Sequence, residues 1–306
     1  MEKNTNPLLC DPDSGICAVP GQTETAPNRF KAFTPEAKPI TVLYFTDPIC
    51  SACWCVEPAL RKLMATYGGM IDLQTHMGGL LPGWEGFNDG GMTKPADIAP
   101  HWEEMGAYFH MPMLGDVWLE DPLMSSYPPS IAFKAAELQD KQKSLAFLRR
   151  LRELVITEKK NITQWPMIAR AATDVGLDTT RLHADLNGAA PALFQADLTL
   201  ARSLGVRGFP TFIFTDATGA RQVVYGARPY ANFEAAVKAL APDAMAAPTP
   251  TSLESLFAIH PTWCAEEVAV AMGITHEQAK AALQSAEARG MLTAVHTRNG
   301  SVWRRK

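Results

Sequence analysis

The sequence predicts an α/β fold for the first 240 residues and a small, separate unit after them. Three observations lead to this prediction. A buried-strand pattern runs straight into a helix that begins among cysteines, a long stretch of helical periodicity follows, and a second strand pair with a helix precedes a linker rich in Ala and Pro. The full length of 306 residues suits two domains of about 150 residues each.

Composition excludes several classes of protein. Apolar residues make up 47% of the chain and the net charge is −4, so a packed core is expected and nothing points globally to nucleic acid or an anionic membrane. The longest apolar runs, such as Ile40–Phe45, are far shorter than the roughly 20 residues of a membrane span. The first residues show no signal-peptide pattern, so we expect a cytoplasmic protein, in which structural disulfides are rare.

The first elements form a strand–helix–strand series. Residues 1–39 are rich in Pro, Thr, Asn and Glu, and we expect them to form an irregular arm. β-Branched and aromatic residues at Ile40–Thr46 predict a buried strand. An apolar face from Cys53 to Tyr67 predicts a helix, which Gly68–Gly69 ends, and the alternation at Ile71–Met77 predicts a second strand.

A helical insertion is predicted over about residues 80–205. Its first part is rich in Gly, Pro, Trp and Met, which predicts loop with short helices. The helices predicted in its later part are Ser130–Lys159, Met167–Gly176, Thr180–Leu186 and Ala192–Gly205. After the insertion, Val206–Phe214 leads into a strand, Arg221–Tyr225 pairs with it, and the helix Tyr230–Leu240 closes the predicted domain, 40–240.

The last part of the chain predicts a small winged-helix-like domain. Residues 241–252 have the composition of a linker, and 253–306 follow it. The helix Ala265–Met272, a second helix capped by Thr275, and a strand pair turning at Asn299-Gly300 match that fold. The domain has six Lys or Arg against five Glu, a weaker basic footprint than DNA-binding domains usually show. Protein contact or a structural role is therefore favoured, with DNA contact as the alternative.

Three cysteines lie within "DPICSACWCVEP", Asp47–Pro58, and Cys50 and Cys53 form a C-x-x-C pair at the start of the predicted helix. A helix N-terminus stabilises a thiolate, so we expect Cys50 to be a partly exposed, attacking thiol. Cys53 follows one turn later, lies deeper and is suited to resolve a mixed disulfide. Cys55 projects to another side of the helix and is expected in the core.

These features together resemble a known branch of proteins. A strand, a C-x-x-C at a helix start, a helical insertion and "GFPT" at Gly208–Thr211 before a late strand resemble the DsbA-like branch of the thioredoxin superfamily. "FTDPICSACWCVEPALRKL" at Phe45–Leu63 is similar to the SpxH (YjbH) adaptor family and to the cytoplasmic FrnE-like dithiol isomerases, and "GGLLPGW" at Gly78–Trp84 to the SpxH group. The resemblance covers about residues 40–240 and implies a thioredoxin-like fold with a helical insertion.

The resemblance also implies roles for single residues. Pro210 would be a cis proline whose backbone docks a substrate strand, with Phe209 and Thr211 beside it in substrate binding. Glu57 would shuttle the proton of the resolving thiol, and an exposed helix glutamate without such a role is the alternative.

Trp54 and Trp84 introduce a series of Trp and Met residues near the predicted site. The series would line an apolar groove for partner chains or else form the core of the insertion. Its other members are Trp102, Trp118, Met92, Met105, Met111 and Met113. His76 and His110 are isolated in the sequence, and both are expected to be structural.

The cysteines also allow other interpretations: a second thiol pair, a zinc site or a related enzyme without the C-x-x-C. Cys10 and Cys17, in "CDPDSGIC", either form a second redox or metal-thiolate pair or have no function. A structural zinc site would need a second C-x-x-C or an H-x-x-x-H, and the sequence has neither, so no metal is predicted. Kappa-type glutathione transferases and chromene isomerases share the implied fold, but they typically carry serine where this chain has Cys50.

The leading hypothesis is a cytoplasmic thiol–disulfide oxidoreductase or isomerase that uses Cys50 and Cys53. No bound cofactor is expected; its partners would be thiol or disulfide proteins and a thioredoxin or glutathione system that recycles it. One alternative is a redox-gated adaptor of the SpxH kind that delivers a partner. Another is a thiol-metal sensor that uses Cys10, Cys17, Cys50 and Cys53 and contacts DNA through the wing.

Overall fold

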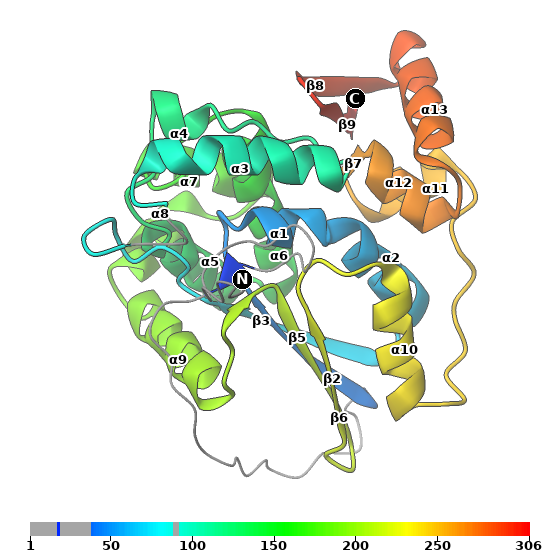
Figure 1. Cartoon of the computed structure of the whole chain (residues 1–306), viewed down its shortest axis with the longest axis horizontal. Coiled ribbons are helices and arrows are strands. Elements are labelled where there is room, and N and C mark those ends of the chain that lie inside the picture. Colours follow the sequence, from blue (N-terminus) through cyan, green and yellow to red (C-terminus); the bar gives the residue numbers. More distant parts are fainter. Residues whose placement is uncertain (1–16, 19–37, 88–91) are drawn as a thin grey trace, which may run out of the picture.

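The structure is a computed structural model that describes residues 17–18, 38–87 and 92–306. Its centre is a four-stranded sheet in the order β3-β2-β5-β6 (Figure 1). The strands are β2 (Ile40–Thr46), β3 (Ile71–Met77), β5 (Thr211–Asp216) and β6 (Arg221–Tyr225). β2 runs parallel to β3 and antiparallel to β5, which is antiparallel to β6. All four lie where the sequence predicts strands.

Helices cover the sheet. α10 packs against α2 and against β5 and β6, whereas α9 packs against β3 (Figure 1). A short helix, α1 (Ser51–Cys55), precedes α2. The bounds of the other three helices are α2 (Glu57–Tyr67), α9 (Ala190–Ser203) and α10 (Tyr230–Leu240). The strand–helix–strand start and the strand–strand–helix end of the predicted unit are therefore both present.

The helix predicted over Cys53–Tyr67 is not continuous, and this prediction was wrong. It begins earlier, at Ser51, and breaks at Val56 between α1 and α2. Pro58 lies in the first turn of α2 and has no N–H to donate to the carbonyl of Trp54. The chain therefore starts a new helix there, and α1 keeps its own direction at the cysteine pair.

The helical insertion contains more breaks than the sequence predicts. A long α3 stands where short helices are expected, and the helix predicted over Ser130–Lys159 is divided at Asp140. Asp140 has extended backbone, and its carboxylate accepts hydrogen bonds from the N–H groups of Gln142 and Lys143, which caps a new helix. The elements are α3 (Pro95–Tyr108), α4 (Val117–Glu120), α5 (Tyr127–Gln139), α6 (Lys141–Arg152), the π-helical η1 (Glu153–Thr157), α7 (Trp165–Asp174) and α8 (Thr179–Leu186).

Residues 253–306, called the C-terminal unit below, have a cluster of buried apolar side chains of their own. Their elements are α11 (Leu253–Ile259), β7 (Thr262–Cys264), α12 (Ala265–Met272), α13 (His276–Ala288), β8 (Leu292–Thr297) and β9 (Gly300–Arg305). The strands form a small antiparallel sheet in the order β7-β9-β8. The Thr275 hydroxyl caps α13 by accepting from Gln278 N–H, as predicted. Strand β7 was not predicted.

A second, two-stranded sheet joins distant parts of the chain. β1 (Cys17–Ala18) pairs antiparallel with β4 (Gly208–Phe209). Figure 1 shows β1, in dark blue, beside the end of the main sheet where α1 begins. Among the described residues, no helix is both long and apolar enough to cross a membrane. The predicted domain boundaries stay predictions.

Candidate functional site

Cys50 and Cys53 lie just beyond the end of β2. Cys50 is the N-cap of α1; its Sγ accepts a hydrogen bond from Cys53 N–H at 3.1 Å, and the two form a disulfide with Cα atoms 5.1 Å apart. Sequence reasoning expected Cys50 to be partly exposed, and this was wrong: both cysteines have 0% exposed surface. α3 packs against α1 on this side, so a partner reaches the sulfur atoms only if some cover moves.

Pro210 lies at the same end of the sheet as the cysteines. The Phe209–Pro210 bond is cis, as expected. Phe45 of β2 pairs with Thr211 of β5, so the residues before Thr211 lie level with the residues that lead from β2 into α1. Thr211 is buried and its hydroxyl donates to Gly208 O at 2.7 Å. Phe209 is buried, and its ring fills the space that a side chain at Gly78 would need. Docking roles for these residues stay predictions.

The two tryptophans predicted to contact substrate lie in the protein interior to different degrees. Trp54 is fully buried; its Nε1 donates to Pro112 O at 3.0 Å and the Arg149 guanidinium lies 4.2 Å from its ring. It has no surface for a substrate, so that prediction does not fit its position. Trp84 is partly buried and packs edge-to-face on Trp118. The other groove candidates that are buried belong to the core of the insertion: Trp102, Trp118, Met105, Met111 and Met113.

Asp47 is a titratable group of the site that sequence reasoning missed. It is fully buried three residues before Cys50, and its backbone carbonyl accepts from Cys50 N–H. Its carboxylate accepts from the N–H groups of Ile49 and Leu80 and from the Ser126 hydroxyl. Burial removes the carboxylate from water and raises its pKa from 3.8 to about 6. Its place directly after a buried strand was the signal that could have identified it.

His101 of α3 is the second missed group. Its Nε2 lies 3.4 Å from the Ser51 hydroxyl, next to Cys50 in the chain. Burial lowers the pKa of His101 to about 4, so the imidazole is neutral near pH 7. A neutral imidazole places no buried charge beside the cysteines, and it has one nitrogen that can accept a hydrogen bond and one that can donate. No motif connects His101 with the C-x-x-C, and only the packing of α3 on α1 reveals it.

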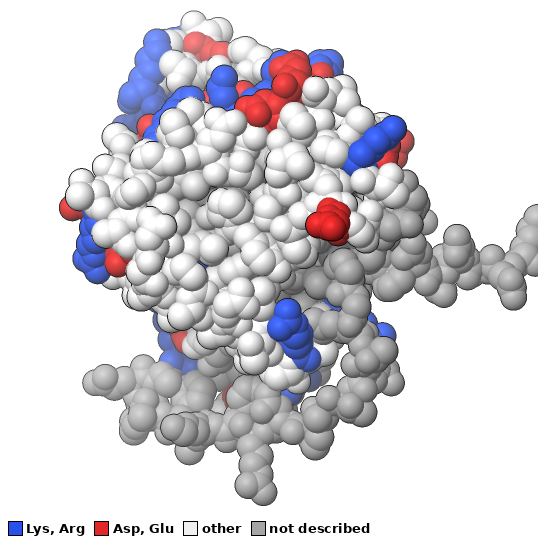
Figure 2. Space-filling model, turned by 90° about the vertical axis from the view of Figure 1, so that its left-hand side faces the viewer, with Lys and Arg blue, Asp and Glu red and all other residues white. Residues whose placement is uncertain are grey.

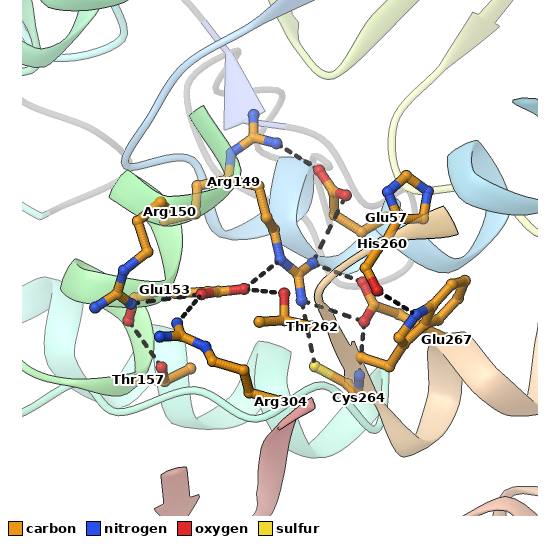
Figure 3. A network of polar contacts seen from close by, with 12 residues as sticks. Glu57, Arg149, Arg150, Glu153, Thr157, His260, Thr262, Cys264, Glu267 and Arg304 are labelled. Carbon is orange, nitrogen blue, oxygen red and sulfur yellow. Dashed lines mark hydrogen bonds and ion pairs between the residues drawn. The ribbon is translucent and has the colours of Figure 1, made fainter. Parts of the chain in front are cut away.

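Glu57 is held in a buried cluster of arginines. Its Oε1 pairs with Arg152 Nη1 at 2.7 Å, and its Oε2 lies 3.6 Å from Arg61. Figure 3 shows Oε2 facing Arg149, which lies 3.7 Å away. The alternative of an exposed helix glutamate is wrong, because Glu57 is 8% exposed. To shuttle a proton, this carboxylate would have to give up its ion pair with Arg152, so the predicted shuttle role would require that the buried pair be broken.

The same cluster joins α6 to the C-terminal unit. Arg149 forms a two-armed pair with Glu267 at 2.6 and 3.2 Å and a pair with Glu153 at 2.9 Å (Figure 3). Arg61 of α2 donates to Thr262 O at 2.6 Å. Burial alone would raise the pKa of Glu153, but the guanidinium of Arg149 and the Thr262 hydroxyl hold that pKa below its ordinary value. The cysteine helices and the C-terminal unit thus share one buried ionic interface.

The β8–β9 turn docks on the insertion. Asn299 Oδ1 accepts from Met113 N–H at 3.0 Å, and Arg298 pairs with Asp116 and Glu103. Arg304 pairs with Glu153 at 3.4 Å. The turn and two basic residues of the possible DNA contact, Arg298 and Arg304, therefore form their contacts within the chain.

The remaining candidate residues fall outside this constellation. Cys55 is buried, as expected, and burial raises the pKa of its thiol. His76 pairs with Asp197 at 2.7 Å, and His110 lies at a turn with a φ of 53°. Cys10 lies outside the described residues, and of Cys17 only its backbone place in β1 is described. In the part of the chain that the structure describes, no group of three His, Cys, Asp or Glu could hold a metal ion.

Comparison with known proteins extends these observations. The thioredoxin family matches residues 43–235. The ClpXP adapter protein SpxH of Halalkalibacterium halodurans is 32% identical over 99% of this chain and 99% of its own length, and that of Shouchella clausii is 30% identical over 96% of each. Among solved structures, the cytosolic disulfide reductase DsbM of Pseudomonas aeruginosa is 25% identical, covers 65% of this chain and 99% of its own, and has a TM-score of 0.53.

Proposed function

Because the chain belongs to the thioredoxin family and, over nearly its full length, to the family of ClpXP adapter proteins SpxH, we propose that it is an adapter that presents a bound protein to ClpXP. The observation that carries this proposal is the 32% identity over 99% of both chains, which includes the C-terminal unit. The disulfide reductase DsbM covers only 65% of this chain. The comparisons therefore support the adapter alternative better than the oxidoreductase hypothesis.

Two structural features support an adapter. The buried ionic interface fixes the C-terminal unit, which we interpret as a winged helix that contacts protein, against the helices that follow the cysteines. Cys50 and Cys53 have no exposed surface, which suits a redox gate better than steady turnover. In this proposal the adapter works in the cytoplasm, where a change in thiol state would alter the partner-binding surface near α1.

We also propose a surface at which a partner protein would bind. Figure 2 shows a face with few charged side chains across its centre, on the side of the molecule where α4 and α8 lie in Figure 1. Leu119, in α4, and Met124, soon after it, are exposed at 59% and 60%. Exposed apolar residues of this kind favour protein contact over nucleic acid.

Thiol–disulfide exchange is the second candidate function, favoured by Cys50 as the N-cap of α1 and by Pro210 at the same end of the sheet. After reduction, the Cys50 thiolate would attack a substrate disulfide and release one substrate thiolate, which takes up a proton. The Cys53 thiolate would then attack the mixed disulfide, release the second substrate thiol and close the Cys50–Cys53 disulfide. A thioredoxin or glutathione system would reduce that disulfide again.

The adapter proposal is tested with proteolytically inactive ClpXP as a trap. Proteins trapped in cells with and without this chain are compared, and a protein trapped only in its presence is purified. We expect purified ClpXP to degrade that protein about tenfold faster or more when the chain is added, because tethering raises its effective concentration. If the chain changes no protein's degradation but reduces insulin, and Cys50→Ser abolishes that reduction, exchange is the function instead.

A further inference from the structure

β4 is a strand with an unusual place and an unusual partner. It consists of Gly208 and Phe209, directly before the cis bond to Pro210, at the cysteine end of the main sheet. It is not a member of that sheet, and within the described residues β1 is its only strand partner. The register places Cys17 opposite Phe209 and Ala18 opposite Gly208. A strand from the other end of the chain, about 190 residues away, thus covers a backbone edge beside Cys50 and Cys53.

Contacts other than the pairing with β1 hold β4 and the neighbouring Pro210 in place. The Thr211 hydroxyl donates a hydrogen bond to Gly208 O, and Gly226 N–H donates one to Pro210 O at 2.9 Å. The buried ring of Phe209 fits against Gly78. A strand held in this way offers a preformed edge to an extended chain, which gains backbone hydrogen bonds at little ordering cost to the protein.

We propose that β1 (Cys17–Ala18) is an internal competitor that occupies the β4 edge and must leave before an extended segment of a partner protein can pair there. This inference rests on the proposed thiol–disulfide exchange of Cys50 with a protein partner. Two observations argue for it together: β1 pairs with β4 directly before Pro210, and β4 lies at the cysteine end of the main sheet. Because the competitor is part of the chain, it keeps a high effective concentration and lowers the apparent affinity of any outside strand.

The proposal is tested in full-length protein with Cys10→Ser, so that arm thiols do not react. The test variant carries Cys17→Pro and Ala18→Pro, which remove both N–H donors of β1, and the matched controls carry Cys17→Ser alone or with Thr23→Pro. The reduced proteins react with an extended eight-residue peptide whose single cysteine is blocked by thionitrobenzoate, and the coloured product is followed. Ellman's reagent, which needs no strand edge, reports thiol access alone.

We expect the double-proline variant to react about five- to tenfold faster with the peptide than both controls, as an edge that is 80–90% occupied would allow. Amide hydrogen exchange of the segment 206–212 should also be faster in that variant. Equal peptide rates together with equal exchange at 206–212 would overturn the inference. Adding Cys50→Ser separates the two proposals: if it leaves product release unchanged, exchange at Cys50 fails, and the hydrogen exchange of 206–212 alone decides whether β1 occupies the edge.

Discussion

The cysteine end of the sheet and the interface with the C-terminal unit are neighbours, but different interactions hold them. At the cysteine end, buried backbone groups and small side chains dominate, as in the hydrogen bonds to Asp47 and the cap at Cys50. At the interface, buried arginines and glutamates pair across elements that are far apart in the sequence.

The difference has a physical consequence. A buried ion pair costs desolvation of both charges, so it stabilises only while every partner is in place. A backbone cap or turn depends on a few adjacent residues and survives changes elsewhere. The interface is therefore the part where a single substitution should have the largest effect on stability. At the cysteine end, one buried carboxylate, Asp47, should make stability depend on pH.

The largest effect is expected for Arg149→Ala. The change leaves Glu267, whose side chain has no exposed surface, and Glu153 without their closest guanidinium. Breaking a buried pair in this way typically costs about 3–5 kcal/mol, and we expect that loss in the free energy of unfolding from urea titration. Arg170→Ala, which removes a half-exposed pair with Glu158, is the control and should cost less than about 1 kcal/mol. Equal costs for the two variants would show that the interface does not depend on its buried charges.

Asp47 gives the cysteine end a pH dependence of predictable sign. Its pKa is about 6 when folded and 3.8 ordinarily, so its contribution to stability is present below pH 4 and is lost as pH rises to 6. The difference corresponds to about 3 kcal/mol. His101 acts in the opposite direction, because its pKa is lowered to about 4 and the folded state gains stability as pH rises toward 6.5.

Comparing the wild type with Asp47→Asn separates the effect of this carboxylate from that of His101 and the other titratable groups. The free energy of unfolding of the wild type minus that of the variant should fall by about 2 kcal/mol between pH 4 and pH 7, because Asn cannot ionise. A flat difference for Asp47→Asn would mean that the buried carboxylate is compensated by its hydrogen bonds.

The comparison also separates what the sequence could predict from what it could not. The four strands and the C-x-x-C at a helix start follow from local patterns, cis Pro210 follows from the family resemblance, and the structure contains them all. The break at Val56 and the split at Asp140 were missed, although Pro58 and the capping carboxylate of Asp140 were visible signals. Helical periodicity alone does not show where one helix ends and the next begins.

Long-range pairing lies beyond such patterns. Arg149 and Glu267 are separated by 118 residues, and nothing near either one in the sequence indicates the other. The burial of Cys50 was missed for the same reason, since α3 and its His101 reach the cysteine helix only through the folded insertion. The sequence could therefore identify the reactive residues, but not what covers and connects them.

The smallest effect is expected at the β8–β9 turn. Asn299→Ala removes the bond to Met113 N–H and should cost about 1 kcal/mol, whereas Arg298→Ala removes exposed pairs and should cost less, with the cost disappearing in high salt. Faster amide hydrogen exchange at Met113 in the double variant would show that these two side chains hold the turn. Binding of a labelled DNA duplex then tests whether the β8–β9 turn contacts DNA. Binding by the double variant but not by the wild type would mean that the contacts between the turn and the insertion cover a DNA-binding surface. Binding by neither would leave the turn as a fastening between the C-terminal unit and the insertion, as an adapter that presents two units as one rigid surface requires.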